Sequence, residues 1–470
     1  HIQPMKKYTY IFPVLLFLFA CNRPPEVIDP PTPPVPVNPP QMGYQQYGTP
    51  FIQMPAIEDV VMYEVNLRAF SQEGTIEGVQ ARWDQLQALG VNVIWLMPIY
   101  PQGEERSVNS PYAIKDFKAV SSEYGDLQSL RTFVDAAHSR GMAVILDWVA
   151  NHTGWDHPWI NTRPDWYTRN SSGEIIHPDG TNWLDVADLN FGSSSMRLEM
   201  IDAMKYWILE ANVDGYRCDY ADGVPASFWK QAIDSLRNIP ERSILMLAEG
   251  ARPDHFDSGF DLNFGWAFYS KMKEVFQGKA GTGAVAIGNT HQSTYNTLPQ
   301  GKHLLRFTTN HDESAWDQTP VRLFGNEEGA LAAFVINTFT GGVPLIYTGQ
   351  EVGQAETVPF FTSQPMDWEQ NPNLRRTYED VMKVYTEHEV ARKGSVAFFS
   401  NHEVFVARRR YEDKEMLIIV NTRNDMGLYD VPAPLQHTSW TNVLFSYTYD
   451  ISDGQQTYSN YDFLLLMRDI

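Results

Sequence analysis

The chain has 470 residues, of which 43% are hydrophobic and 20% are charged, and its formal net charge at pH 7 is -21. This composition is typical of a folded chain that is long enough for one large domain and a smaller one. The excess of negative charge argues against a nucleic-acid partner, because phosphate binding needs a basic surface. We therefore expect an acidic, folded protein with a neutral ligand.

Residues 1–21 have the pattern of an export signal. A short basic start at 5–7 precedes an apolar run at 11–20, which is too short to span a bilayer. The ending LFAC (18–21) resembles the lipoprotein box of bacteria, which implies a lipid anchor on Cys21. The alternative is an ordinary secretory signal with a chance cysteine. We expect an extracytoplasmic protein that contacts a bacterial membrane only through this anchor, on the periplasmic face or at the cell surface.

Residues 22–50 are predicted to form a proline-rich linker. Nine prolines fall between residues 24 and 40, and such a stretch favours polyproline II and cannot pack a core. At about 3.1 Å per residue it would form a stiff tether of roughly 50 Å. The folded body would then lie near a membrane without being embedded in it.

From residue 51 to about residue 385, short apolar runs alternate with helical patterns. The strand candidates are 60–67, 93–96, 143–146, 213–216, 244–248, 259–262, 304–308 and 343–347. Strands separated by helix-sized stretches predict an α/β fold with a parallel sheet, most simply closed as a (β/α)8 TIM barrel. An open doubly wound sheet is the alternative, but no glycine-rich phosphate loop follows the first strand.

Two segments depart from this alternation. Residues from about 152 to 190 show no helical period and are rich in Trp, Asn, Asp, Gly and Pro, which predicts an inserted excursion that borders a functional cleft. From residue 386 to the C terminus, strands and turns replace the helices, with strand candidates at 395–399, 404–410, 416–421 and 463–467. This pattern predicts an all-β terminal domain.

Charged residues directly follow four of the predicted barrel strands. The carboxylates are Asp147, Asp219, Glu249 and Asp312, accompanied by Arg217 and His311. The carboxyl ends of the strands carry the active site of a closed barrel, so these side chains are expected on one rim. Each alone could be a helix cap or an ion-pair partner, but four on successive strands indicate a functional site.

Carboxylates gathered on one rim, without a metal-ligand cluster, suit cleavage of a glycosidic bond. A retaining mechanism needs two carboxyl groups about 5–5.5 Å apart, one a nucleophile and one an acid/base. Asp219 and Glu249 follow adjacent predicted strands, which permits that separation. Arg217 would point to the same side of its strand as Asp219 and keep it ionised. Asp312 could stabilise the positively charged transition state.

Four segments resemble, in order, the conserved segments of the alpha-amylase family, glycoside hydrolase family 13. They are DWVANH (147–152), GYRCDYAD (215–222), LAEG (247–250) and TTNHDE (308–313). Supporting segments are YEVNLRAFS (63–71), VADLN (186–190) and GGVPLIYTGQEVG (341–353). The resemblance extends from about residue 56 to the C terminus, and the set is highly specific. It implies a barrel at 51–385 with a short inserted domain after the third strand, and a C-terminal β-sandwich at 386–470.

The resemblance also implies roles for single residues. Asp219 would be the nucleophile, Glu249 the acid/base and Asp312 the transition-state stabiliser. Arg217 would orient the nucleophile. The residues that would bind the sugar at the cleavage point are Tyr112, Asp147, His152 and His311. The implied activity is hydrolysis of α-1,4 bonds in starch-like glucans or malto-oligosaccharides through a covalent glycosyl-enzyme.

The chain departs from the family pattern after Asp219. Residues 220–223 read Tyr-Ala-Asp-Gly, without the Lys-His pair that many starch-cleaving members carry, so the leaving-group side is undefined. Asn151 and Asp188 match positions that bind Ca2+ in some members, whereas members with short inserted loops often lack the ion. The predicted reaction requires no cofactor, and Ca2+ stays an open alternative.

Other activities use the same catalytic residues. Transglycosylation and attack on α-1,6, sucrose or trehalose linkages therefore remain alternatives that product analysis would distinguish. An alternative of another class is a non-catalytic, surface-anchored glucan-binding protein. Fold alone does not define function, so the site residues decide between the two classes. A non-catalytic protein is disfavoured because the catalytic set is intact, namely Asp219, Glu249, Asp312 and Arg217.

Overall fold

The structure is a computed structural model that describes residues 43–470. The predicted signal, Cys21 and most of the predicted linker lie outside the described residues. The end of that linker contacts helix α6 (Ser194–Glu210): the Tyr44 hydroxyl donates to Asp202 Oδ2 at 2.5 Å, and Tyr47 N donates to Leu209 O at 2.8 Å. Within residues 43–470, no helix is both long and apolar enough to cross a membrane.

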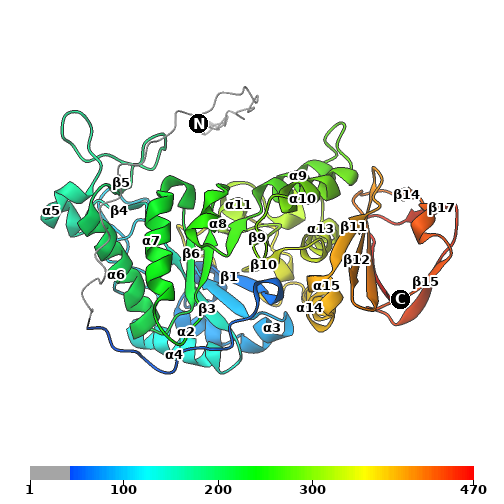
Figure 1. Cartoon of the computed structure of the whole chain (residues 1–470), viewed down its shortest axis with the longest axis horizontal. Coiled ribbons are helices and arrows are strands. Elements are labelled where there is room, and N and C mark those ends of the chain that lie inside the picture. Colours follow the sequence, from blue (N-terminus) through cyan, green and yellow to red (C-terminus); the bar gives the residue numbers. More distant parts are fainter. Residues whose placement is uncertain (1–42) are drawn as a thin grey trace, which may run out of the picture. The chain divides into compact units, whose positions relative to one another are not determined.

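Eight parallel strands close into a barrel in the order β1-β10-β9-β8-β7-β6-β3-β2 (Figure 1). Their bounds are β1 Met62–Val65, β2 Val93–Leu96, β3 Ala143–Trp148, β6 Gly215–Cys218, β7 Leu245–Ala248, β8 Leu262–Phe264, β9 His303–Arg306 and β10 Val343–Tyr347. Nearly all their residues are buried, because one face lines the barrel interior and the other packs under helices. The predicted (β/α)8 barrel is confirmed.

Helices connect the strands and cover the barrel. The longer ones are α4 (Leu127–His138), α6, α7 (Ala226–Arg237), α9 (Trp266–Phe276), α10 (Val285–Tyr295), α13 (Glu327–Phe339) and α14 (Pro372–Glu387). In α4, the Asp126 side chain caps the first turn by accepting the Ser129 N–H, which satisfies a free helix donor. Its apolar residues recur three and four apart and are buried: Leu130, Phe133, Val134 and Ala137.

One predicted strand lies at a different place. The sequence predicts a strand at 259–262, whereas Asp254–Ser258 form helix α8 and Gly259 ends that helix with φ of +110°. Such a left-handed residue is a common helix terminator, and glycine adopts it without a Cβ clash. Strand β8 therefore begins only at Leu262.

The excursion after β3 contains a small antiparallel ladder. Strands β4 (His152–Gly154) and β5 (Val186–Asp188) pair so that His152 lies opposite Asp188. Between them lie the single-turn helix α5 (Trp159–Thr162) and a 3-10 turn at Pro164–Trp166. The ladder places His152 at the start of the excursion, directly after the barrel strand that carries Asp147.

The C-terminal region forms two packed sheets. A six-stranded sheet has the order β11-β12-β13-β18-β15-β16, and β14 pairs with β17. The bounds are β11 Ser395–Phe398, β12 Val404–Tyr411, β13 Lys414–Asn421, β14 Gly427–Asp430, β15 Thr438–Asn442, β16 Tyr447–Ile451, β17 Gln455–Tyr458 and β18 Phe463–Asp469. They share a separate hydrophobic core that includes Val406, Ile419 and Trp440, so the predicted β-sandwich is confirmed. Buried Arg409 of β12 ties this sheet to α13 by donating to Phe339 O at 3.1 Å.

Candidate active site

The predicted carboxylates gather around one buried arginine at the carboxyl ends of the strands. Arg217 Nη1 lies 2.7 Å from Asp147 Oδ1 and 3.0 Å from Asp219 Oδ1, and its Nη2 lies 3.0 Å from Glu249 Oε2. Strands β6 and β7 are neighbours in register, with Cys218 opposite Ala248. Asp219 directly follows β6 and Glu249 directly follows β7, so their carboxyl groups contact Nη1 and Nη2 of the same guanidinium.

A hydrogen-bonded cluster forms next to this carboxylate group. The Tyr112 hydroxyl lies 3.0 Å from Asp147 Oδ2 and 2.8 Å from His311 Nε2, and its ring stacks on the His311 ring at 5.4 Å. The Trp95 indole donates to Asp147 Oδ2 at 3.0 Å. These contacts fix polar groups at the base of the site, as expected for a surface that binds the hydroxyls of a sugar.

His152 lies on the excursion side of the site. Its side chain is buried, and burial lowers its pKa to about 4, so the ring is neutral at pH 7. The Trp183 ring lies 5.7 Å from it and 4.9 Å from the Tyr220 ring. The excursion therefore contributes an aromatic side chain beside the predicted nucleophile, which fits the prediction that it borders the cleft.

The direction of the pKa shift of Asp219 differs from the sequence-based expectation. Arg217 contacts Asp219 as predicted and acts to lower its pKa, but burial is the larger effect. The negative charges of Glu249, Asp147 and Asp312 act in the same direction as burial, so the pKa of Asp219 lies well above its ordinary value. One guanidinium is shared among several carboxyl groups, so its effect on the pKa of Asp219 is smaller than that of burial.

Asp147 and Asp312 are affected by the same environment. Burial raises the pKa of Asp147 to about 6 against the opposing effect of Arg217. Asp312 lies at the start of α11 (His311–Trp316), with its side chain 39% exposed toward the cleft. Loss of hydration there, together with the charge of Glu249, raises its pKa to about 7. Both carboxyl groups therefore keep a proton to a higher pH than an exposed aspartate does.

Glu64 is a site residue that the sequence-based reasoning did not single out. It is fully buried on β1, and its Oε1 lies 2.5 Å from His311 Nδ1. Burial raises the pKa of this carboxyl, and His311 opposes the shift. A charged residue within the apolar run 60–67 was the available signal, because such a residue is rarely buried without a partner.

One exposed aromatic side chain, that of Trp316, lies near His311 of the site. Trp316, at the end of α11, is 65% exposed and lies 5.8 Å from the Phe360 ring and 5.4 Å from the Phe361 ring. Phe360 in turn lies 5.2 Å from the His311 ring. A large apolar side chain that stays exposed next to a polar site is a candidate binding surface.

The two predicted Ca2+ ligands lie at the β4–β5 ladder. Asn151 directly precedes β4, and Asp188 is half-buried at the end of β5, opposite His152. Across residues 43–470, no group of three or more His, Cys, Asp or Glu side chains is arranged to hold a metal ion.

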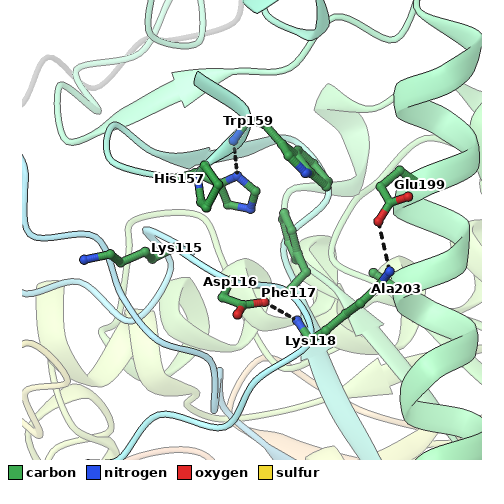
Figure 2. Close-up of a pocket in the computed structure, with 9 residues that line it drawn as sticks. Lys115, Asp116, Phe117, Lys118, His157, Trp159, Glu199 and Ala203 are labelled. Carbon is green, nitrogen blue, oxygen red and sulfur yellow. Dashed lines mark hydrogen bonds and ion pairs between the residues drawn. The ribbon is translucent and has the colours of Figure 1, made fainter. Parts of the chain in front are cut away.

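A separate hollow of about 150 Å3 lies between the excursion and α6 (Figure 2). Its charged groups already contact one another, since Lys118 Nζ lies 2.9 Å from Glu199 Oε1. His157 Nδ1 accepts the Trp159 backbone N–H at 3.1 Å, a contact drawn in Figure 2. None of the predicted site residues lines this hollow, so the chemistry belongs to the barrel rim.

The sequence model for the catalytic domain of alpha amylase matches residues 58–405. The chain belongs to the alpha-amylase family. Members of this family are glycoside hydrolases that act on O-glycosyl bonds. The matched region contains all the predicted catalytic and sugar-binding residues, from Tyr112 to Asp312.

Similar proteins are alpha-amylases and related enzymes. The alpha-amylase MalA of Haloarcula japonica is 30% identical over 310 residues, which cover 63% of this chain and 44% of that protein. A cyclomaltodextrinase of Thermoanaerobacter pseudethanolicus is 24% identical over 74% of this chain and 63% of its own length. The chain thus spans less than two thirds of each of these two relatives. The crystal structure of an alpha-amylase from Lactobacillus plantarum has a TM-score of 0.78 at 26% identity, covering 88% of this chain and 99% of that one.

Proposed function

We propose that this chain hydrolyses α-1,4 bonds of starch-like glucans or malto-oligosaccharides with retention of anomeric configuration. The observation that carries the proposal is the contact of one guanidinium, that of Arg217, with both Asp219 and Glu249 at 3.0 Å. A pair of carboxyl groups held so close suits a nucleophile and an acid/base better than a water-spaced inverting pair.

In the first step, a carboxylate oxygen of Asp219 attacks the anomeric carbon while Glu249 donates a proton to the glycosidic oxygen. The C–O bond breaks, the leaving sugar departs as an alcohol, and a glycosyl ester on Asp219 remains. In the second step, Glu249 takes a proton from water, which attacks the anomeric carbon and releases Asp219. Asp312 stabilises the positive charge that develops on the sugar in both steps.

Several side chains would hold the sugar at the cleavage point. Tyr112 offers a ring face, while Asp147, His311 and His152 offer polar atoms. The proposed substrate is supported by the names of the relatives, which include an alpha-amylase and a cyclomaltodextrinase. The strongly negative net charge agrees with a neutral substrate.

Product analysis tests this proposal directly. The full chain is incubated with soluble starch, pullulan, maltoheptaose and sucrose, and the products are separated by chromatography, with Asp219→Asn as the control. Malto-oligosaccharides from starch and maltoheptaose, absent in the control, are expected. Transfer products longer than the substrate would favour transglycosylation, and activity on sucrose or only on the α-1,6 bonds of pullulan would contradict the proposed linkage.

We also propose that the chain is held to an extracytoplasmic membrane face by a lipid on Cys21. The support is the LFAC ending at 18–21 and the proline-rich stretch that follows it. Expression in a bacterium supplied with an alkyne fatty acid should label the wild type and leave Cys21→Ser unlabelled. Equal labelling of both, or of neither, would contradict the anchor.

A further inference from the structure

The segment that carries Asp219 also holds the backbone around Glu249. Glu249 N donates to Cys218 O, and Ala221 N donates to Glu249 O, each at 3.0 Å. Tyr220 N donates to Glu249 Oε2 at 2.7 Å. The Glu249 side chain is therefore positioned by the backbone of the segment that carries Asp219.

Asp222 extends these contacts beyond Glu249. Its Oδ1 accepts the Ala251 and Arg252 backbone N–H groups at 3.2 Å each, and its Oδ2 accepts the Ala251 N–H at 3.0 Å. Burial alone would raise the pKa of Asp222, but its bonds with His255 and with these N–H groups bring that pKa below its ordinary value. An ionised carboxylate thus holds the backbone that immediately follows Glu249.

His255 of α8 completes the arrangement from the other side. Its Nε2 lies 2.7 Å from Asp222 Oδ1, its side chain is fully buried, and its Nδ1 has no hydrogen-bond partner. Gly250 lies between these groups, and a Cβ there would overlap both Asp222 Oδ1 and His255 Nε2. The close approach requires glycine at this position and leaves the loop after Glu249 little freedom.

We infer that Asp222 and His255 are positioning residues that hold Glu249 in the geometry required for proton transfer to the leaving group. The inference rests on the proposed role of Glu249. It also gives a role to part of the sequence that departs from the family pattern after Asp219. Where many members carry a Lys-His pair, Asp222 keeps its side chain 38% exposed and accepts hydrogen bonds from the backbone that follows Glu249.

The test compares two substrates that differ in their need for a proton. Maltoheptaose has a sugar leaving group that must be protonated, whereas α-maltotriosyl fluoride loses fluoride without acid assistance. Azide is added to both assays, because this anion attacks a glycosyl-enzyme without help from a base.

The variants are Asp222→Asn and His255→Gln, with Glu249→Gln as the reference for complete loss of the acid/base. Asp234→Asn on α7 is the matched control, since Asp234 is 59% exposed and pairs only with Lys230 among the ion pairs of the described residues.

We expect Asp222→Asn and His255→Gln to lower kcat/KM for maltoheptaose by about 10-fold to 100-fold. This is less than the roughly 100-fold to 10,000-fold that acid/base catalysis contributes, because Glu249 itself remains. Their kcat/KM for the fluoride should change less than about threefold, since the nucleophile is untouched. Equal losses on both substrates, or no loss on either, would overturn the inference. A wild type that is inactive on both substrates would instead overturn the proposed function. The role of Glu249 would be overturned if Glu249→Gln did not lose much more activity on maltoheptaose than on the fluoride.

Discussion

Glu64 and His311 form a buried pair at the base of the site, with Glu64 Oε1 2.5 Å from His311 Nδ1. The other nitrogen of His311 lies 2.8 Å from the Tyr112 hydroxyl, which reaches Asp147 at 3.0 Å. A continuous chain of hydrogen bonds therefore joins strands β1 and β3 through two predicted sugar-binding residues. Glu64 sets the orientation of His311 although it lies too deep to meet solvent.

Glu64→Ala should therefore impair catalysis more than Glu64→Gln. Alanine leaves His311 Nδ1 without its buried partner, a change that costs about 1–3 kcal/mol, whereas glutamine still offers an oxygen. We expect kcat/KM for maltoheptaose to fall at least about tenfold in Glu64→Ala and less in Glu64→Gln. Steady-state kinetics of both variants checks this, with Glu77→Ala at an exposed position of helix α2 (Ile76–Gln80) as the control. Equal activities of alanine variant and wild type would contradict the role of Glu64.

Arg217→Lys should fail to replace arginine. A single ammonium cannot contact Asp147, Asp219 and Glu249 with the fixed fork of a guanidinium, and removing one partner of a buried pair costs about 3–5 kcal/mol. We expect a lower melting temperature and a loss in kcat/KM of at least about 100-fold. Arg237→Lys is the matched control, because Arg237 pairs with Asp261 at a position that is 36% exposed. Near wild-type activity of Arg217→Lys would argue against the shared guanidinium.

Asp219→Asn should be more stable than the wild type at pH 8. The pKa of Asp219 is raised on folding, so between its unfolded and folded pKa the folded state binds more protons and unfolding free energy falls as pH rises. The ionised Asp219 therefore destabilises the folded state fully at pH values above its folded pKa and not at all below its unfolded pKa. Asparagine carries no charge and removes this destabilisation. We expect a melting temperature roughly 1–3 °C above wild type at pH 8, with the gap closing toward pH 4. Scanning calorimetry at both pH values would refute this if the variant were the less stable protein at pH 8.

Trp316→Ala should weaken substrate binding without affecting the fold. The side chain is 65% exposed, so its removal leaves no cavity, while a stacking contact with a sugar would be lost. A loss of about 0.5–1.5 kcal/mol corresponds to a KM for maltoheptaose about 2-fold to 12-fold higher, and kcat should fall as well because the Trp316 side chain hydrogen-bonds Asp312. Phe445→Ala, which removes a side chain 72% exposed in the C-terminal domain, serves as the control. A fall in kcat alone would place Trp316 outside the binding surface.

Much of the site could be predicted because its residues follow apolar runs directly. Asp147, Asp219 and Glu249 each come at the end of a buried strand, and a closed barrel brings such positions together. The strand predicted at 259–262 begins three residues before β8 does, because the apolar pattern alone does not distinguish the end of a short helix at Gly259 from the start of a strand.

Other features depend on contacts that no local pattern encodes. Arg217 lies where the sequence predicts, but the pKa of Asp219 follows from how deeply the whole cluster is buried. The partners of Asp222 and of Glu64 come from α8 and α11, far along the chain. Only the folded barrel shows which of these carboxylates contact Arg217 and which hold another residue in place.

The most direct test of the central claim is the anomeric configuration of the first product. Maltoheptaose is hydrolysed by the full chain, and proton NMR follows the new reducing ends before mutarotation. Retention through a glycosyl ester on Asp219 predicts that the α-anomer appears first, and that Asp219→Asn forms no product. Initial release of the β-anomer, or undiminished activity of Asp219→Asn, would contradict the account.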